Sequence, residues 1–144
     1  MDRPRLLIID DAVNLSLFYR EELLDEGYEV DVAHSLPDAH KLLDINSYDL
    51  MIVETNLKGS KDFDNLCTLL NNNIYELPVI INTGTPLSEF DKKMCSFKAY
   101  IEKSSDIMPL KEKVNDLLSE TFDLITLKKY LTLSKILHYY GDSL

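Results

Sequence analysis

The chain has few cysteines, no long hydrophobic run and a deficit of basic side chains. Its only two cysteines, Cys67 and Cys95, are far apart and form no C-x-x-C pair, which excludes a zinc ribbon and a redox dithiol. Free cysteines are usually buried. We therefore interpret both residues as buried, reduced thiols.

The first apolar run, Leu6–Ile9, is too short for the core of a signal peptide or for a membrane span. This predicts a cytoplasmic protein with no membrane contact. The 15 basic and 25 acidic side chains leave a formal charge of −10, which repels the phosphates of nucleic acids. We therefore expect no direct binding of nucleic acid.

Short apolar runs alternate with segments of helical spacing along most of the 144 residues. The runs predict strands at residues 6–9, 30–33, 50–53, 78–83 and 99–102. Between them, the spacing predicts helices that start near Leu15, Ser35, Phe63, Thr85 and Pro109, the last ending at Ser119. Strands alternating with helices in this way predict an α/β fold, a doubly wound parallel sheet with helices on both faces.

Beyond this unit, leucines and tyrosines at helical spacing predict a sixth helix over residues 122–140. We divide the chain into a domain of residues 1–121 and a C-terminal helical extension of residues 122–144. Two interpretations of the extension stay open. It packs back on the domain, or its wide apolar surface forms a homodimer or connects to an output region.

Polar side chains follow several of the predicted strands directly. Asp10 and Asp11 end the first strand, Glu54 ends the third, Thr83 ends the fourth and Lys103 follows the fifth. In a doubly wound sheet, ligands bind at the carboxyl ends of the strands. Three carboxylates in one crevice repel one another, so either a carboxyl pKa rises or a cation such as Mg²⁺ neutralises them.

The order and spacing of these segments resemble the receiver domain of two-component response regulators, over about residues 6–118. The matching segments are Leu6–Asp11, Tyr48–Val53, Asn56–Leu57 with Gly59, Thr83, and Tyr100–Lys103. The resemblance implies a five-stranded parallel sheet in the order 2-1-3-4-5. It also implies a signalling domain, with no enzyme activity of its own, that takes a phosphoryl group from a histidine kinase onto a strand-end aspartate.

The resemblance assigns a role to several pocket residues. Asp10 and Asp11 correspond to the family's acidic pair, Thr83 to its switch hydroxyl, Tyr100 to its switching aromatic residue and Lys103 to its lysine. The phosphate-accepting position holds Glu54, which is one methylene longer than aspartate. A displacement of about 1 Å can cost on the order of a hundredfold in rate.

We therefore interpret the chain as a pseudo-receiver, in which Glu54 reaches toward Thr83 or Lys103 and partly imitates the phosphorylated state. Its partners would be a histidine kinase or an output protein, bound on the face made by the fourth helix, fifth strand and fifth helix. Asp11, Glu54 and the Asn56 carbonyl are the candidate Mg²⁺ ligands, and we expect weak binding or none.

Two alternatives remain. In the first, the domain is an Mg²⁺-dependent phosphorelay receiver that is phosphorylated on Glu54 or Asp10. In the second, it is a small hydrolase, a class that needs an acid two residues after its nucleophilic aspartate, whereas Asp11 directly follows Asp10. Ser104 replaces the proline that usually follows the family's lysine, so the Lys103–Ser104 peptide bond should be trans.

Overall fold

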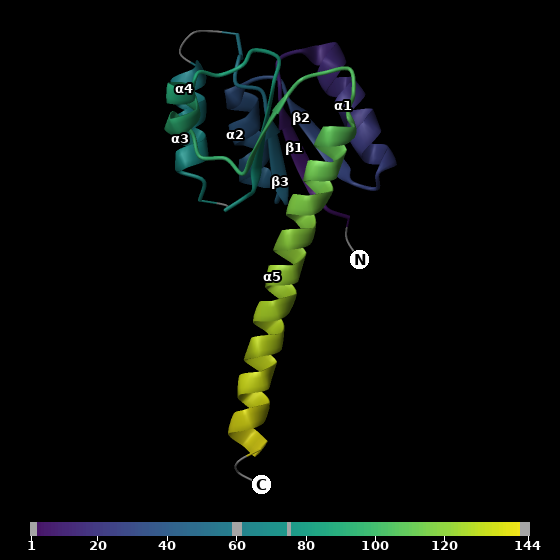
Figure 1. Cartoon of the computed structure of the whole chain (residues 1–144), viewed down its shortest axis with the longest axis vertical. Helices are drawn as coiled ribbons and strands as arrows, with labels where there is room; N and C mark the ends of the chain where they lie inside the picture. Colours follow the sequence, from purple (N-terminus) through teal and green to yellow (C-terminus); the bar gives the residue numbers. More distant parts are fainter. Residues whose placement is uncertain (1–2, 59–61, 75, 142–144) are drawn as a thin grey trace.

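The computed structural model describes residues 3–58, 62–74 and 76–141, and its strands and helices alternate along the chain (Figure 1). The strands are β1 (Arg5–Ile9), β2 (Glu29–Ala33), β3 (Leu50–Val53), β4 (Val79–Thr83) and β5 (Ala99–Glu102). The helices are α1 (Val13–Asp25), α2 (Leu36–Ile45), α3 (Asp62–Asn71), α4 (Glu89–Met94) and α5 (Met108–Gly141).

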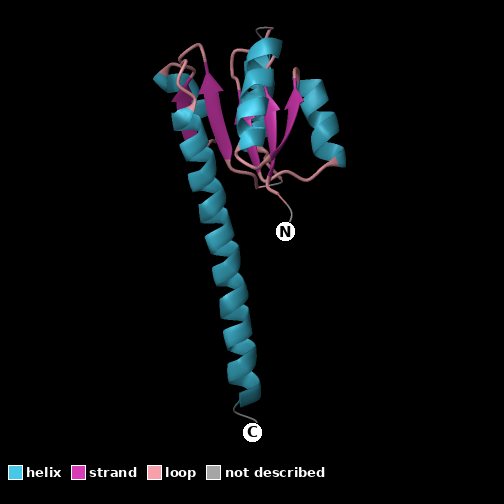
Figure 2. Ribbon diagram, turned by 90° about the vertical axis from the view of Figure 1, so that its right-hand side faces the viewer, coloured by secondary structure: helices cyan, strands magenta, loops and turns pink. Residues whose placement is uncertain are grey.

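All five strands are parallel, in the order β2-β1-β3-β4-β5, which confirms the predicted fold class. The central strands are buried on both faces, and this is why their sequences are continuous apolar runs. Leu7 and Ile9 of β1 pack on the side of α2 and α3, whereas Leu6 and Ile8 pack on the side of α1 and α5. The helices therefore cover both faces of one sheet (Figure 2).

Serine side chains cap the starts of two helices, and one of these helices starts later than predicted. The Ser35 side chain caps α2 by accepting a hydrogen bond from the Asp38 N–H, as its sequence pattern predicts. The predicted start of α4 at Thr85 is wrong, because the helix begins at Glu89 with Ser88 as its cap. Thr85 instead forms a turn, in which its N–H donates to the Thr83 hydroxyl.

The end of the chain also differs from the prediction. Residues 108–141 form one continuous helix, α5, in place of a fifth and a sixth helix. Residues 119–121 are serine, glutamate and threonine, and none of them interrupts a helix as proline or glycine does. From Ser119 onward the described side chains are exposed, so this part does not pack back on its own domain. None of the helices in the described ranges is long and apolar enough to span a bilayer.

The two cysteines form a disulfide bond, so the interpretation as reduced thiols is wrong, although both residues are buried as expected. Cys67 lies in α3 and Cys95 follows α4, and their Cα atoms are 4.7 Å apart, within the range that disulfides need. A separation of 28 residues gives no sign of this proximity, since only the packing of α3 against the end of α4 creates it.

We expect Cys95→Ser to lower the free energy of unfolding by roughly 3–4 kcal/mol, because a disulfide that closes a loop of this length restricts the unfolded chain. Urea denaturation of the variant and the wild type measures the difference. Reductant should destabilise the wild type to the same extent and leave the variant unchanged. Equal stability of the oxidised wild type and the variant would contradict the role of this bond.

Candidate functional site

A compact polar cluster lies at the end of the sheet where the strands have their carboxyl ends. Asp10 follows β1, Glu54 follows β3, Thr83 ends β4 and Lys103 follows β5, all within a network of direct contacts. The parallel strand order places these four ends side by side. The sequence-predicted residues are therefore brought together by the topology of the sheet, although they are up to 93 positions apart.

Lys103 lies at the centre of this cluster. Its Nζ is 2.7 Å from Asp10 Oδ2 and 2.7 Å from Glu54 Oε2, and the side chains of the two acids are only 3% and 5% exposed. One ammonium group thus neutralises part of the charge of two buried carboxylates. Such a charged group, removed from water, is stable only when its partners are in contact with it.

The carboxylate of Glu54 accepts two contacts on each oxygen. Oε1 accepts hydrogen bonds from the Thr83 hydroxyl at 2.6 Å and from the Asn56 N–H at 2.8 Å. Oε2 accepts one from the Gly84 N–H at 3.1 Å and pairs with Lys103. The glutamate therefore reaches both Thr83 and Lys103, and its acceptor sites are occupied by protein donors.

These contacts set the ionisation of the cluster. Burial raises the pKa of Glu54, but the bonds from Lys103, Thr83 and the Asn56 N–H outweigh burial and bring the pKa below its usual value. Burial likewise lowers the pKa of Lys103, but the contacts with Asp10 and Glu54 prevail and raise it. Glu54 is thus ionised and Lys103 protonated at neutral pH.

Asp11 stands apart from this network. It is partly exposed, and its Oδ2 accepts a hydrogen bond from the Lys58 N–H at 2.9 Å. The Asn56 side chain donates to the Thr85 hydroxyl at 3.1 Å. No group of three or more His, Cys, Asp or Glu side chains suited to a metal ion occurs among the described residues. With the Glu54 oxygens already bonded, the candidate Mg²⁺ ligands do not form a fitting set.

Tyr100 lies in β5, three residues before Lys103, and contacts the loop that precedes α4. Its hydroxyl accepts a hydrogen bond from the Leu87 N–H at 2.8 Å, and Lys92 Nζ lies 4.3 Å from the centre of its ring. The half-buried ring thus ties β5 to the β4–α4 connection. No cis peptide bond occurs in the described segments, so the Lys103–Ser104 bond is trans as predicted.

Sequence reasoning missed the contribution of the residues that follow β4. Gly84 supplies a backbone N–H to Glu54, and the Thr85 hydroxyl accepts a hydrogen bond from the Asn56 side chain. Any residue type except proline can supply a backbone N–H. Only their position directly after Thr83 could have pointed to them.

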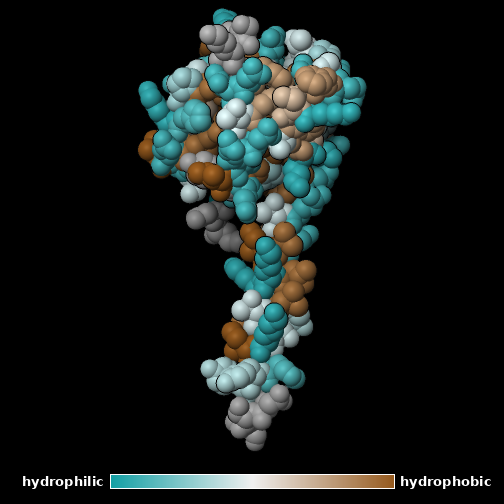
Figure 3. Space-filling model, turned by 90° about the vertical axis from the view of Figure 1, so that its left-hand side faces the viewer, coloured by the Kyte–Doolittle hydropathy of each residue, from teal (hydrophilic) through white to brown (hydrophobic). Residues whose placement is uncertain are grey.

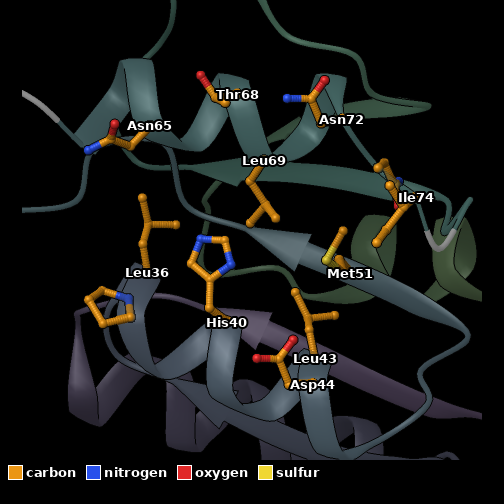
Figure 4. Close-up of a pocket in the computed structure, with 12 residues that line it drawn as sticks. Leu36, His40, Leu43, Asp44, Met51, Asn65, Thr68, Leu69, Asn72 and Ile74 are labelled. Carbon is orange, nitrogen blue, oxygen red and sulfur yellow. The ribbon is translucent and has the colours of Figure 1, made fainter.

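A groove of about 580 Å³ lies elsewhere, between α2 and α3 (Figure 4). Leu36, Leu43, Leu69 and Met51 line it, and His40 points from α2 into the space between the two helices. None of the residues of the polar cluster lines it. This groove and the polar cluster are therefore separate features.

Comparison with known proteins gives a consistent result. The sequence model of the response regulator receiver domain matches residues 6–115. TrrA from Thermotoga maritima, solved in complex with Mg²⁺-BeF, is 28% identical, with a TM-score of 0.69 over 79% of this chain and 98% of its own. Among curated proteins, no sequence matches the chain.

Two other solved structures show the same fold. A CheY-like receiver domain from Methanospirillum hungatei is 22% identical, with a TM-score of 0.76 over 85% of this chain and 98% of its own. A fusion that contains the trimeric coiled coil of yeast Spc42 is 20% identical, with a TM-score of 0.74. It covers 97% of this chain and 99% of its own, so the similarity includes much of α5.

Lys103→Met should lower the free energy of unfolding by about 3–5 kcal/mol at neutral pH, because it leaves two buried carboxylates without their cation. Urea denaturation provides the measurement. Adding Glu54→Gln should recover part of this loss, since one of the two charges is then removed. As a control, Glu89→Gln in an exposed ion pair should cost less than roughly 1 kcal/mol. Equal costs for Lys103→Met and Glu89→Gln would contradict the analysis.

Proposed function

Because this chain belongs to the response regulator receiver domain family of two-component signalling, we propose that it acts through protein contacts without phosphorylation of its acceptor position. The observation that carries the proposal is the state of Glu54, whose two oxygens each accept two contacts from the protein. The glutamate side chain itself bonds Thr83 and Lys103, so both groups have a partner without a phosphoryl group. The domain is then a pseudo-receiver with a fixed conformation.

Phosphoryl transfer would require a carboxylate oxygen that is free to attack. Here an attacking oxygen of Glu54 must first lose a hydrogen bond or the ion pair to Lys103. The extra methylene also changes the position of the carboxylate relative to that of an aspartate, and misplacement of about 1 Å can cost on the order of a hundredfold in rate. Both effects oppose reaction at this position.

Weak or absent Mg²⁺ binding is part of the same proposal. A magnesium ion prefers near-octahedral oxygen ligands and binds through one or two carboxylates that are free to coordinate it. Glu54 and Asp10 are both held by Lys103, and Asp11 is bonded to the Lys58 N–H. Binding would therefore have to break contacts that already neutralise the cluster.

For output, we propose the surface formed by α4, β5 and the first turns of α5. Tyr100 connects β5 to the loop before α4, and Phe90 and Met94 of α4 are exposed. Phe90 and Met94 are one helical turn apart, and an exposed apolar pair of this kind suits a protein partner, such as a histidine kinase or an output protein. The charge of −10 disfavours nucleic acid and anionic membranes as partners, and no enzyme activity is proposed.

The proposed location is the cytoplasm, the compartment expected for a receiver that meets a histidine kinase. The Cys67–Cys95 disulfide is more typical of proteins from oxidising compartments. The location therefore stays a prediction, which cell fractionation checks.

Incubation with Mg²⁺ and a small phosphodonor should leave the wild type unmodified and add one phosphoryl group to Glu54→Asp. Shortening the side chain withdraws the carboxylate from Thr83 and Lys103 and leaves those groups for a phosphoryl oxygen. Intact mass spectrometry measures the result, and Glu54→Gln serves as the control without an acceptor. Stoichiometric modification of the wild type that is lost in Glu54→Gln would establish the phosphorelay alternative.

We further propose that the protein is a homodimer held by the exposed part of α5. Large apolar side chains from Phe122 to Tyr140 are 46–73% exposed there, an arrangement that usually marks an interaction site.

Light scattering on the full chain should give twice the mass of one chain at micromolar concentration and above. The dimer should dissociate on dilution, since its interface is confined to one helix. A monomeric mass at the highest accessible concentration would contradict the homodimer and leave the proposal for Glu54 unaffected.

A further inference from the structure

The exposed part of α5, residues 119–141, is defined here as the tail. Figures 1 and 2 show that it leaves the domain at the end of the sheet opposite the carboxyl ends of the strands. Hydrophobic side chains lie along it between hydrophilic ones (Figure 3). A helix of this kind is rarely stable alone in water, and most helical stability in proteins comes from packing of an apolar face.

The side of α5 that contacts its own domain continues into the tail as a mixed surface. Leu110, Val114 and Leu117 are buried against the sheet. Thr121, Lys128 and Lys135 follow Val114 at intervals of seven residues, so they remain within about 60° of it around the helix. Leu124 and Leu131 follow Leu117 at the same interval, so this side of the tail alternates apolar and polar residues.

The other side of the tail carries an apolar line in its last three turns, whereas the same line nearer the domain is polar, with Ser119, Asp123 and Thr126. Tyr130, Leu133, Leu137 and Tyr140 follow one another at steps of three and four residues, the spacing of a coiled-coil contact. We call these four residues the seam. At 100° per residue, the seam lies about 150° from the domain-contacting side. Its side chains are 60–72% exposed.

We propose that the seam is the surface on which a second copy of this chain packs, seam against seam. This inference rests on the proposed homodimer and specifies which face of the helix forms it. Because the seam points away from the domain-contacting side, a partner helix can lie along it without meeting the domain. The two receiver domains then lie on the outer sides of the helix pair.

Area and charge both suit a second copy. Tyr130 and Tyr140 of the seam are about two-thirds exposed, and each can bury on the order of 150 Å². With Leu133 and Leu137, one seam offers on the order of 500 Å², so two seams together bury on the order of 1,000 Å², the size of a weak, reversible interface. The tail is also nearly neutral, with three lysines and two acids, so two tails meet little repulsion.

To test whether the seam forms the interface, a glutamate is placed either on the seam or beside it in the full chain. Leu133→Glu should raise the dissociation constant of the dimer by roughly a hundredfold or more, because it buries two unpaired carboxylates. Thr132→Glu places the same charge one residue away, beside the seam, and should change the constant less than threefold. Concentration-dependent light scattering and sedimentation measure both. Leu137→Glu is a second seam variant with the same expected result as Leu133→Glu.

The outcomes separate the two proposals. A wild-type dimer that Leu133→Glu and Leu137→Glu dissociate and Thr132→Glu does not supports the seam. A dimer that is insensitive to both seam variants overturns the seam and leaves the homodimer standing. A wild-type monomer removes the homodimer and the seam together, and a wild-type trimer overturns the pairing of two copies. Since the tail is exposed, far-UV circular dichroism should show the domain folded in every variant.

Discussion

The contact on which the site depends is the Lys103 ammonium shared by two buried carboxylates. Asp10 and Glu54 approach the same nitrogen at 2.7 Å from the ends of two neighbouring strands, and neither would be stable there as an unpaired charge. Lys103 follows β5, at the edge of the sheet beyond β4. The cluster therefore connects one edge of the sheet to its centre, and Thr83 on the intervening strand completes the connection.

Both carboxylate oxygens of Glu54 are bonded within this cluster. The glutamate carboxylate fills the space between Thr83, Gly84 and Lys103 and supplies the negative charge that balances the lysine. The lowered pKa of Glu54 and the raised pKa of Lys103 show that each group stabilises the charge of the other. The proposed phosphorylation-independent function follows from this internal balance.

Much of the fold was predictable from sequence, because buried parallel strands require continuous apolar runs and both Leu6–Ile9 and Leu50–Val53 are of this kind. The polar cluster was predictable because its members follow strands directly. The contact of Cys67 with Cys95 was not, since it depends on how α3 packs against the end of α4. The donation from Gly84 was not either, because a backbone N–H has no sequence signature. The start of α4 and the continuity of α5 could not be predicted either, because they depend on single residues with weak preferences for starting or ending a helix.

The unbroken path of α5 has a mechanical consequence. The first turns of this helix are fixed to the sheet by Leu110, Val114 and Leu117, and the same rigid rod continues to Gly141. At about 1.5 Å per residue, the part beyond Leu117 is a lever of roughly 35 Å, so a tilt of about 5° at the domain displaces the tip by about 3 Å. Any such tilt would therefore be larger at the far end of the helix than at the sheet, and a helix joined there would change its angle.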